Sequence, residues 1–283
     1  MMRMSQFVPV QRLSVLAGIA GLLFVLLLLP AAVSAEEKSL TISGSTTVLP
    51  IASAVAEAYM AKNPDIDVKV SGGGSGAGIS AIGKKTVDIG MSSRDLKDDE
   101  KAAYAKLVVT PVAKDGISII VNTANPVESL SLAQIKDIYT GTATSWKDVG
   151  GSQDAFEIVG RDSASGTREF FFTEVMKKAD FTKFMLEKNS NGAVQQLVSQ
   201  TPTAIGYVGM EFVDGVKVVS LNVDGKALKP TVESVKSGEY PLSRDLYFLT
   251  NGEPSGSAKE FIDFLLSAEG QKIVEENGFV SIN

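Results

Sequence analysis

The sequence predicts an α/β protein in which helices alternate with mostly parallel strands. Two observations support this class. From residue 39 to the C-terminus, short segments with period-two alternation of apolar residues are followed by segments with helical spacing. In addition, three of the predicted strands end in glycine and hydroxyl residues directly before a predicted helix, as is typical of strand-to-helix turns.

The first elements show the pattern clearly. Apolar and polar residues alternate over 39–43, which predicts a strand. Ile51, Val55 and Tyr59 then recur every four residues, and the pair 63–64, Asn-Pro, ends a helix of about four turns. The same reasoning predicts further strands at 66–70, from 87 onward, and at 107–112, 117–121, 156–159, 205–208, 216–221 and 246–249. It predicts further helices around 79–82 and at 132–139, 166–177, 193–199, 257–267 and 270–277.

Residues 1–35 have the layout of a secretory signal peptide. Arg3 and Arg12 precede an apolar run over 15–29, and the small residues of 31–35 suggest cleavage after Ala35. We therefore expect export to the periplasm or the cell exterior. The alternative is an uncleaved N-terminal anchor, although the apolar run is slightly short of a span of about 20 residues.

Charge and composition exclude several functions. Loss of the two leader arginines leaves 25 basic against 33 acidic residues, a net charge of −8, which does not favour nucleic acid as a partner. The chain contains no Cys and no His. Disulfides, Cys/His metal sites and nucleophiles activated by His are therefore excluded, and we expect no metal and no cofactor.

Three predicted strand-to-helix junctions share one chemistry. Each combines glycine with Ser or Thr at a place where the first N–H groups of a helix have no internal partners. The helix dipole adds partial positive charge there, so each junction is a candidate anion site. An ordinary helix cap explains any one of them, but three in one α/β chain predict a shared site with many donors. The junctions lie at 43–47, 72–76 and 161–167.

The glycine-rich stretch 70–86, VSGGGSGAGISAIGKKT, superficially resembles nucleotide-binding loops. It satisfies G-x-G-x-x-[GA], and it misses a Walker A loop because Lys85 stands where Ser or Thr is required. Lys84 and Lys85, however, fall at the far end of the short predicted helix, away from its anion-binding N-terminus. We therefore predict a small oxyanion rather than a nucleotide.

Four motifs in order resemble the PstS family of phosphate-binding proteins, the periplasmic receptors of phosphate ABC transporters. They are ISGSTTVLP, SGGGSGAGI, DIGMSSRDL and GRDSASGTREFF, and the C-terminal segment is also similar. The resemblance implies a two-lobed type II periplasmic-binding-protein fold whose hinge consists of two crossover strands. By that analogy, residues 36–115 with 246–283 form one lobe, and residues 116–245 form the other. It also implies a monomer that works with a membrane permease.

The resemblance further implies a set of phosphate ligands. These are Thr46, Thr47, Ser75, Arg161, Ser165, Gly166 and Thr167, to which we add Ser93 and Arg94.

The segment Ser92-Ser93-Arg94 departs from the family pattern. Ser93 stands where the family has an Asp that accepts the ligand's proton and so rejects sulfate. Asp162, next to Arg161, is the preferred replacement, and Glu169 is a second candidate. Arg94 either supplies a second cation or pairs with Asp95 or Asp98.

The predicted function is high-affinity binding of inorganic phosphate between the two lobes and its delivery to a phosphate ABC transporter, without catalysis. A receptor for molybdate, tungstate or sulfate is the alternative within the same class. A secreted phosphate-ester enzyme is the rival from another class, and an adhesion or sensor module with the same fold is a third possibility.

Overall fold

The computed structural model describes residues 38–282. The strands are β1 (Lys38–Gly44), β2 (Ile66–Ser71), β3 (Ile89–Ser92), β4 (Leu107–Val121), β5 (Ser129–Ser131), β6 (Glu157–Arg161), β7 (Leu186–Lys188), β8 (Ala204–Gly209), β9 (Lys217–Val223), β10 (Lys226–Leu228) and β11 (Ser243–Asn251). The helices are α1 (Leu49–Lys62), α2 (Ser75–Gly83), α3 (Asp98–Ala103), α4 (Leu132–Thr140), α5 (Gly166–Glu174), α6 (Asn191–Gln200), α7 (Val232–Lys236), α8 (Gly256–Leu266) and α9 (Ala268–Glu276), with a 3₁₀ turn η1 (Trp146–Val149).

The strands form a mixed sheet in the order β2-β1-β3-β11-β4-β8-β6-β7, with β9 on β4 and with β5 and β10 on β9. The pairs β1–β2, β1–β3, β6–β7, β6–β8 and β5–β9 are parallel. The contacts of β11 with β3 and β4, and those of β4 with β8 and β9, are antiparallel. The prediction of mostly parallel strands was therefore wrong, because the crossing strands β4 and β11 run against their neighbours.

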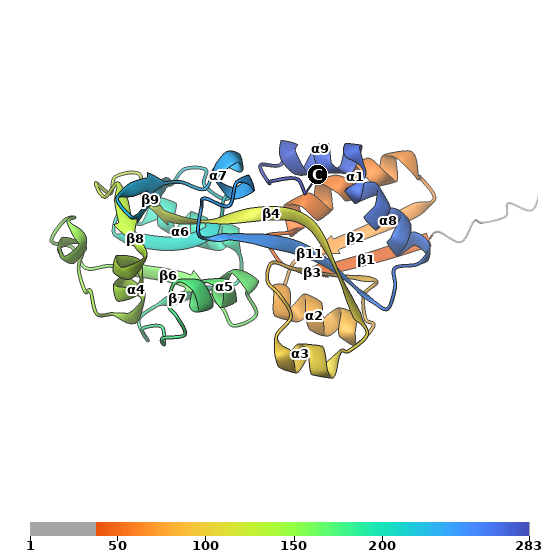
Figure 1. Ribbon diagram of the computed structural model, residues 1–283, viewed down its shortest axis with the longest axis horizontal. Coiled ribbons are helices and arrows are strands. Elements are labelled where there is room, and N and C mark those ends of the chain that lie inside the picture. Colours follow the sequence, from red (N-terminus) through yellow and green to blue (C-terminus); the bar gives the residue numbers. More distant parts are fainter. Residues whose placement is uncertain (1–37, 283) are drawn as a thin grey trace, which may run out of the picture. The chain divides into compact units, whose positions relative to one another are not determined.

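Strand β4 connects the two halves of the sheet. Its residues 107–116 pair with β11, and its residues 117–121 pair with β8. Figure 1 shows β4 and β11 side by side along this connection. The sequence predicted two strands here, because the polar segment 114–116 interrupts the apolar pattern; pairing with β11 keeps the backbone extended through it.

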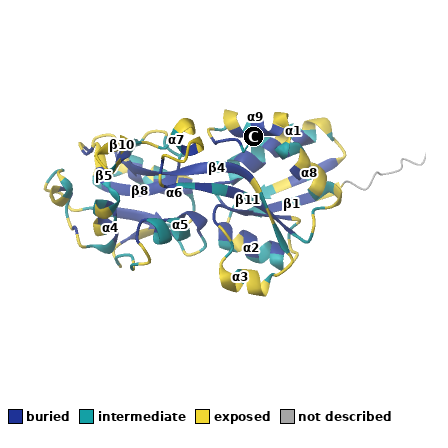
Figure 2. Cartoon of the chain, viewed as in Figure 1, coloured by how far each residue is buried: buried dark blue, intermediate teal, exposed yellow. Residues whose placement is uncertain are grey.

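The fold is the two-lobed α/β architecture of periplasmic binding proteins, with a hydrophobic core in each lobe. One core joins apolar residues of β1, α1, β2, β3 and β11 with those of α8 and α9. The other joins β4 and β8 with α4, α5 and β9. Figure 2 shows buried strands between helices whose outer faces are exposed, and α3 has no buried residue. The exact boundaries of the lobes stay a prediction.

Helix α5 ends earlier than the predicted helix 166–177. Lys177 and Lys178 adopt positive φ angles of 50° and 64°, in the left-handed region that stops a helix. The predicted signal peptide lies outside the described residues. Within residues 38–282, no helix is both long enough and apolar enough to cross a bilayer.

Candidate functional site

The first junction, between β1 and α1, depends on close packing of glycines. Gly44 ends β1 with a φ of +142°, and a Cβ there would lie 2.3 Å from the Met91 carbonyl oxygen. A Cβ on Gly78 would lie 2.7 Å from Gly44 Cα. Part of the glycine-rich stretch therefore lets α2 pack tightly against β1 and β3. Next to this contact lie Thr46 and Thr47, the second of which is almost completely buried.

The second junction places Ser75 at the first position of α2, fully buried. The backbone N–H of Ser93 donates to Ser75 Oγ at 3.0 Å, and the two hydroxyl oxygens are 3.3 Å apart. One residue further along α2, Gly76 N–H donates to the Ala164 carbonyl oxygen at 2.9 Å. Since Ala164 belongs to the third junction, the second and third junctions are in direct contact.

Arg161 ends β6 and is the buried cation of the third junction, with 1% of its surface exposed. Four of its five side-chain N–H groups donate to neutral oxygens of described residues, namely the carbonyls of Lys188 and Asn189, Asn191 Oδ1 and Thr46 Oγ1. Burial lowers the pKa of Arg161 to about 10, although the Asp162 charge partly opposes this, so the group stays positive at neutral pH. A buried cation whose hydrogen bonds go to neutral groups is well suited to an anionic ligand.

The remaining residues of the third junction meet the other two junctions at the start of α5. Ser165 caps this helix by accepting a hydrogen bond from Arg168 N at 3.2 Å. Thr167 Oγ1 lies 3.2 Å from Thr47 Oγ1. A Cβ on Gly166 would lie 2.2 Å from Ser75 Oγ, so only glycine allows this approach. We call these converging residues the cradle: Thr46, Thr47, Ser75, Ser93, Arg161, Ser165, Gly166 and Thr167.

Arg94 and Asp162 engage other partners. Both terminal nitrogens of Arg94 donate to the Glu100 carboxylate, each at 2.7 Å, so its ion pair differs from the predicted pairing with Asp95 or Asp98. The same ion pair and hydrogen bonds to the backbone hold the pKa of Glu100 below its usual value against the effect of burial. Asp162 Oδ1 accepts a hydrogen bond from the backbone N–H two residues later, at 3.1 Å. Its role as proton acceptor stays a prediction.

Glu169, the second candidate acceptor, forms a salt bridge with Lys97 at 2.6 Å. The two side chains are partly exposed and link α5 to the segment before α3.

Sequence reasoning missed two polar residues that contact the cradle. Asn191, fully buried, donates to Thr47 Oγ1 at 2.9 Å. Arg244 on β11 donates to Thr47 Oγ1 at 3.3 Å and to the Ser93 carbonyl at 3.2 Å. Asp115 on β4 holds Arg244 in a buried salt bridge of 2.6 Å.

Both missed residues had a signal in the sequence. Asn191 lies in a Ser-Asn-Gly run after a short strand, which is a fourth junction of the same kind. Arg244 has the same strand parity as Leu246 and Phe248, so period two turns all three toward the interior.

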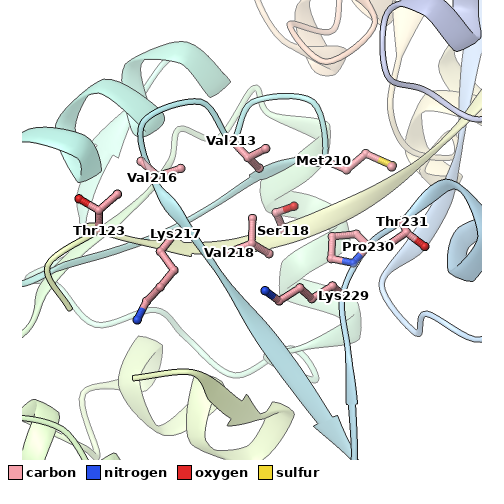
Figure 3. Close-up of a pocket in the computed structure, with 10 residues that line it drawn as sticks. All are labelled: Ser118, Thr123, Met210, Val213, Val216, Lys217, Val218, Lys229, Pro230 and Thr231. Carbon is pink, nitrogen blue, oxygen red and sulfur yellow. The ribbon is translucent and has the colours of Figure 1, made fainter. Parts of the chain in front are cut away.

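A separate pocket of about 580 Å³ lies beside β4 and β9 (Figure 3). Valines and Met210 provide much of its lining, together with Lys217, Lys229 and the buried Ser118. The cradle is built from other residues.

In sequence, residues 30–269 match the family described as the PBP superfamily domain. The fold is therefore that of a two-lobed protein of this superfamily.

Individual relatives narrow the class. The chain is 38% identical over 251 residues to the phosphate-binding protein PstS of Bacillus subtilis, covering 87% of this chain and 83% of that protein. It is 32% identical to PstS of Borreliella burgdorferi, with coverage of 87% and 91%. A crystal structure of a phosphate ABC transporter substrate-binding protein from Clostridium perfringens, with bound phosphate, matches 87% of this chain and 100% of that chain with a TM-score of 0.82 and 39% identity. The structure of an ABC-type phosphate transport receptor from Vibrio cholerae is 36% identical in sequence and has a TM-score of 0.71. The match covers 85% of this chain and 99% of that chain. The chain belongs to the PstS family.

Proposed function

We propose that this protein binds inorganic phosphate with high affinity in the cradle between its lobes and delivers it to the membrane permease of a phosphate ABC transporter. The observation that carries the proposal is the buried Arg161, whose five side-chain N–H groups make four hydrogen bonds within residues 38–282, all to neutral oxygens, beside the hydroxyl groups of the cradle. An oxyanion removed from water is stable only where most of its oxygens receive hydrogen bonds. The names of the relatives point to phosphate as that oxyanion.

The contacts across the cradle support a closing motion of the lobes. Thr47 and Gly76 belong to the predicted first lobe, and their partners Thr167 and Ala164 belong to the second. A ligand held by both sides stabilises the closed state over the open one, and the crossing strands β4 and β11 provide the hinge. We infer that the permease recognises this closed state.

Titration calorimetry of residues 36–283 with phosphate, sulfate and molybdate tests the proposal. We expect a dissociation constant for phosphate of about 1 µM or tighter, and weaker binding of the other two anions. Tighter binding of sulfate or molybdate favours the alternative receptor, and affinity for phosphate weaker than about 1 mM contradicts the proposal. Hydrolysis of a phosphate ester by the purified protein supports an enzyme instead.

We further propose that the protein is exported and acts as a monomer. Mass spectrometry of the protein secreted by its host is expected to find an N-terminus at Glu36; retention of residues 1–35 indicates an anchor. Light scattering of the purified protein measures its mass in solution, and a dimer contradicts the second expectation.

A further inference from the structure

The amide of Asn191 has one orientation that its neighbours enforce. Its Oδ1 faces two groups that only donate, Arg161 Nη1 at 3.2 Å and the backbone N–H of Gly209 at 3.4 Å. The Nδ2 group therefore points the other way and donates to Thr47 Oγ1 at 2.9 Å and to Thr46 Oγ1 at 3.4 Å.

Each threonine hydroxyl then receives two hydrogen bonds. Thr47 Oγ1 accepts from Asn191 and from Arg244 Nη2 at 3.3 Å. Thr46 Oγ1 accepts from Asn191 and from Arg161 Nη2 at 3.1 Å. A hydroxyl has two acceptor positions and one proton, so both hydroxyls are left able only to donate. It follows that Thr47 is the donor in its 3.2 Å contact with Thr167. An oxyanion bound to Thr47 therefore takes the place of Thr167 as the acceptor of this one proton.

Arg244 is held in place from the hinge. Its Nε and Nη2 donate to Asp115 Oδ2 at 2.9 and 2.6 Å, and its Nη1 donates to the Ser93 carbonyl at 3.2 Å. The strands β4 and β11, which connect the lobes, thus fix the donor that orients Thr47.

We propose that Asn191 and Arg244 are positioning residues that force the hydroxyls of Thr46 and Thr47 to donate, so that this side of the cradle accepts only unprotonated oxygens of an oxyanion. The inference rests on the proposed function and deepens it. A protonated phosphate oxygen that faces these hydroxyls places two O–H donors opposite each other, and no hydrogen bond forms between them. Each proton added to phosphate therefore leaves fewer oxygens that can accept a hydrogen bond from Thr46 and Thr47. The doubly charged phosphate ion is therefore preferred over the singly charged one.

Several charged groups surround these hydroxyls and set the background for a pH experiment. Arg161 comes from β6 and Arg244 from β11, with Asp115 of β4 behind Arg244. Asp162 adjoins Arg161. The buried Glu211 interacts electrostatically with Asp115 and Arg244. A matched control must leave all of these unchanged.

The test is titration calorimetry of phosphate at mildly acidic and mildly alkaline pH, with the wild type, Asn191→Ala and the control Asn122→Ala. Asn122 is also a buried amide of the predicted second lobe, but it donates to carbonyls at the end of α6, away from the cradle. We expect Asn191→Ala to weaken phosphate binding at alkaline pH by about 10- to 100-fold. We expect the ratio of alkaline to acidic affinity to shrink by about 2- to 10-fold, since each hydroxyl regains an acceptor position. Asn122→Ala keeps the wild-type affinity and the wild-type ratio.

A second variant covers the case in which Asn191→Ala does not fold. Arg244→Lys keeps the positive charge beside Asp115, but an ammonium group on a single stem does not reproduce the fork that also reaches Thr47. The same shrinkage of the affinity ratio is expected. Equal weakening at both pH values in these variants, or an unchanged ratio, overturns the inference while leaving phosphate binding intact. A wild type that binds no phosphate at either pH contradicts the proposed function itself.

Discussion

Glu211, in the segment after β8, is predicted to make the protein less stable as the pH rises. Among residues 38–282, neither of its buried carboxylate oxygens has a hydrogen-bond partner. The carboxylate folds back over Gly209, where a Cβ would lie 2.7 Å from one of these oxygens. Burial raises the pKa of Glu211 well above its usual value, and the charge of Asp115 raises it further. Two groups lower the pKa of Glu211 in part, namely the residue's own backbone N–H and the charge of Arg244. That N–H does not meet hydrogen-bonding geometry with the carboxylate.

The sign and the slope follow from proton linkage. The folded protein holds the proton of the Glu211 carboxyl more tightly than the unfolded chain does. The contribution of this carboxyl to the free energy of unfolding is therefore fully present below its pKa in the unfolded chain, about 4.3. As the pH rises from there to the raised folded pKa, the free energy of unfolding falls by about 1.4 kcal/mol per pH unit. Glu211→Gln removes the titrating group, so the variant lacks this loss.

Urea unfolding of the wild type and Glu211→Gln at a series of pH values measures the effect. The buried Gln amide of the variant changes the free energy of unfolding by the same amount at every pH. Only the Glu211 carboxyl of the wild type makes that free energy depend on pH. We expect the stability difference, variant minus wild type, to grow with pH by about 1.4 kcal/mol per unit across this window. Glu57→Gln, on the exposed side of α1, is the control and follows the wild type. Parallel curves for Glu211→Gln and the wild type refute the reasoning.

Three further predictions concern the cradle and two residues next to it in the sequence. Gly166→Ala places a Cβ 2.2 Å from Ser75 Oγ and should weaken phosphate affinity by about 10- to 100-fold in calorimetry, while an unchanged affinity contradicts this close approach. Arg94→Met should change the affinity by less than about tenfold, because Glu100 already holds this cation; a larger loss identifies Arg94 as a ligand. Asp162→Asn should reduce the preference for phosphate over sulfate in competition titrations, and unchanged discrimination excludes Asp162 as the proton acceptor.

The sequence predicted the α/β class and the three junctions because these are local properties. Alternation of apolar residues marks the strands, and glycine with Ser or Thr marks the turns that follow. The contact between Thr47 and Thr167 is not local, since 120 residues separate them. The two were linked only by the expectation that the three junctions share one site and by the family resemblance. The roles of Asn191 and Arg244 depend on the same long-range geometry.

The continuous strand β4 shows the limit of reasoning from sequence patterns. The segment Lys114-Asp115-Gly116 looks like a turn, and Asp115 looks like a surface residue. In the structure, Asp115 is fully buried, because Arg244 of the neighbouring strand neutralises it. A buried ion pair of this kind becomes predictable only when both partners are known to face each other across the sheet.

Calorimetric titration of phosphate into the wild type and Arg161→Met tests the central claim most directly. Arg161 is the buried cation whose side chain donates four hydrogen bonds to neutral oxygens in the described structure. Removing a buried, hydrogen-bonded charge from its anionic partner costs about 2–5 kcal/mol, so we expect the affinity to fall by about 30-fold or more. Circular dichroism and thermal unfolding verify that the variant is folded. A folded Arg161→Met that binds phosphate as tightly as the wild type contradicts the claim that this cradle holds the anion.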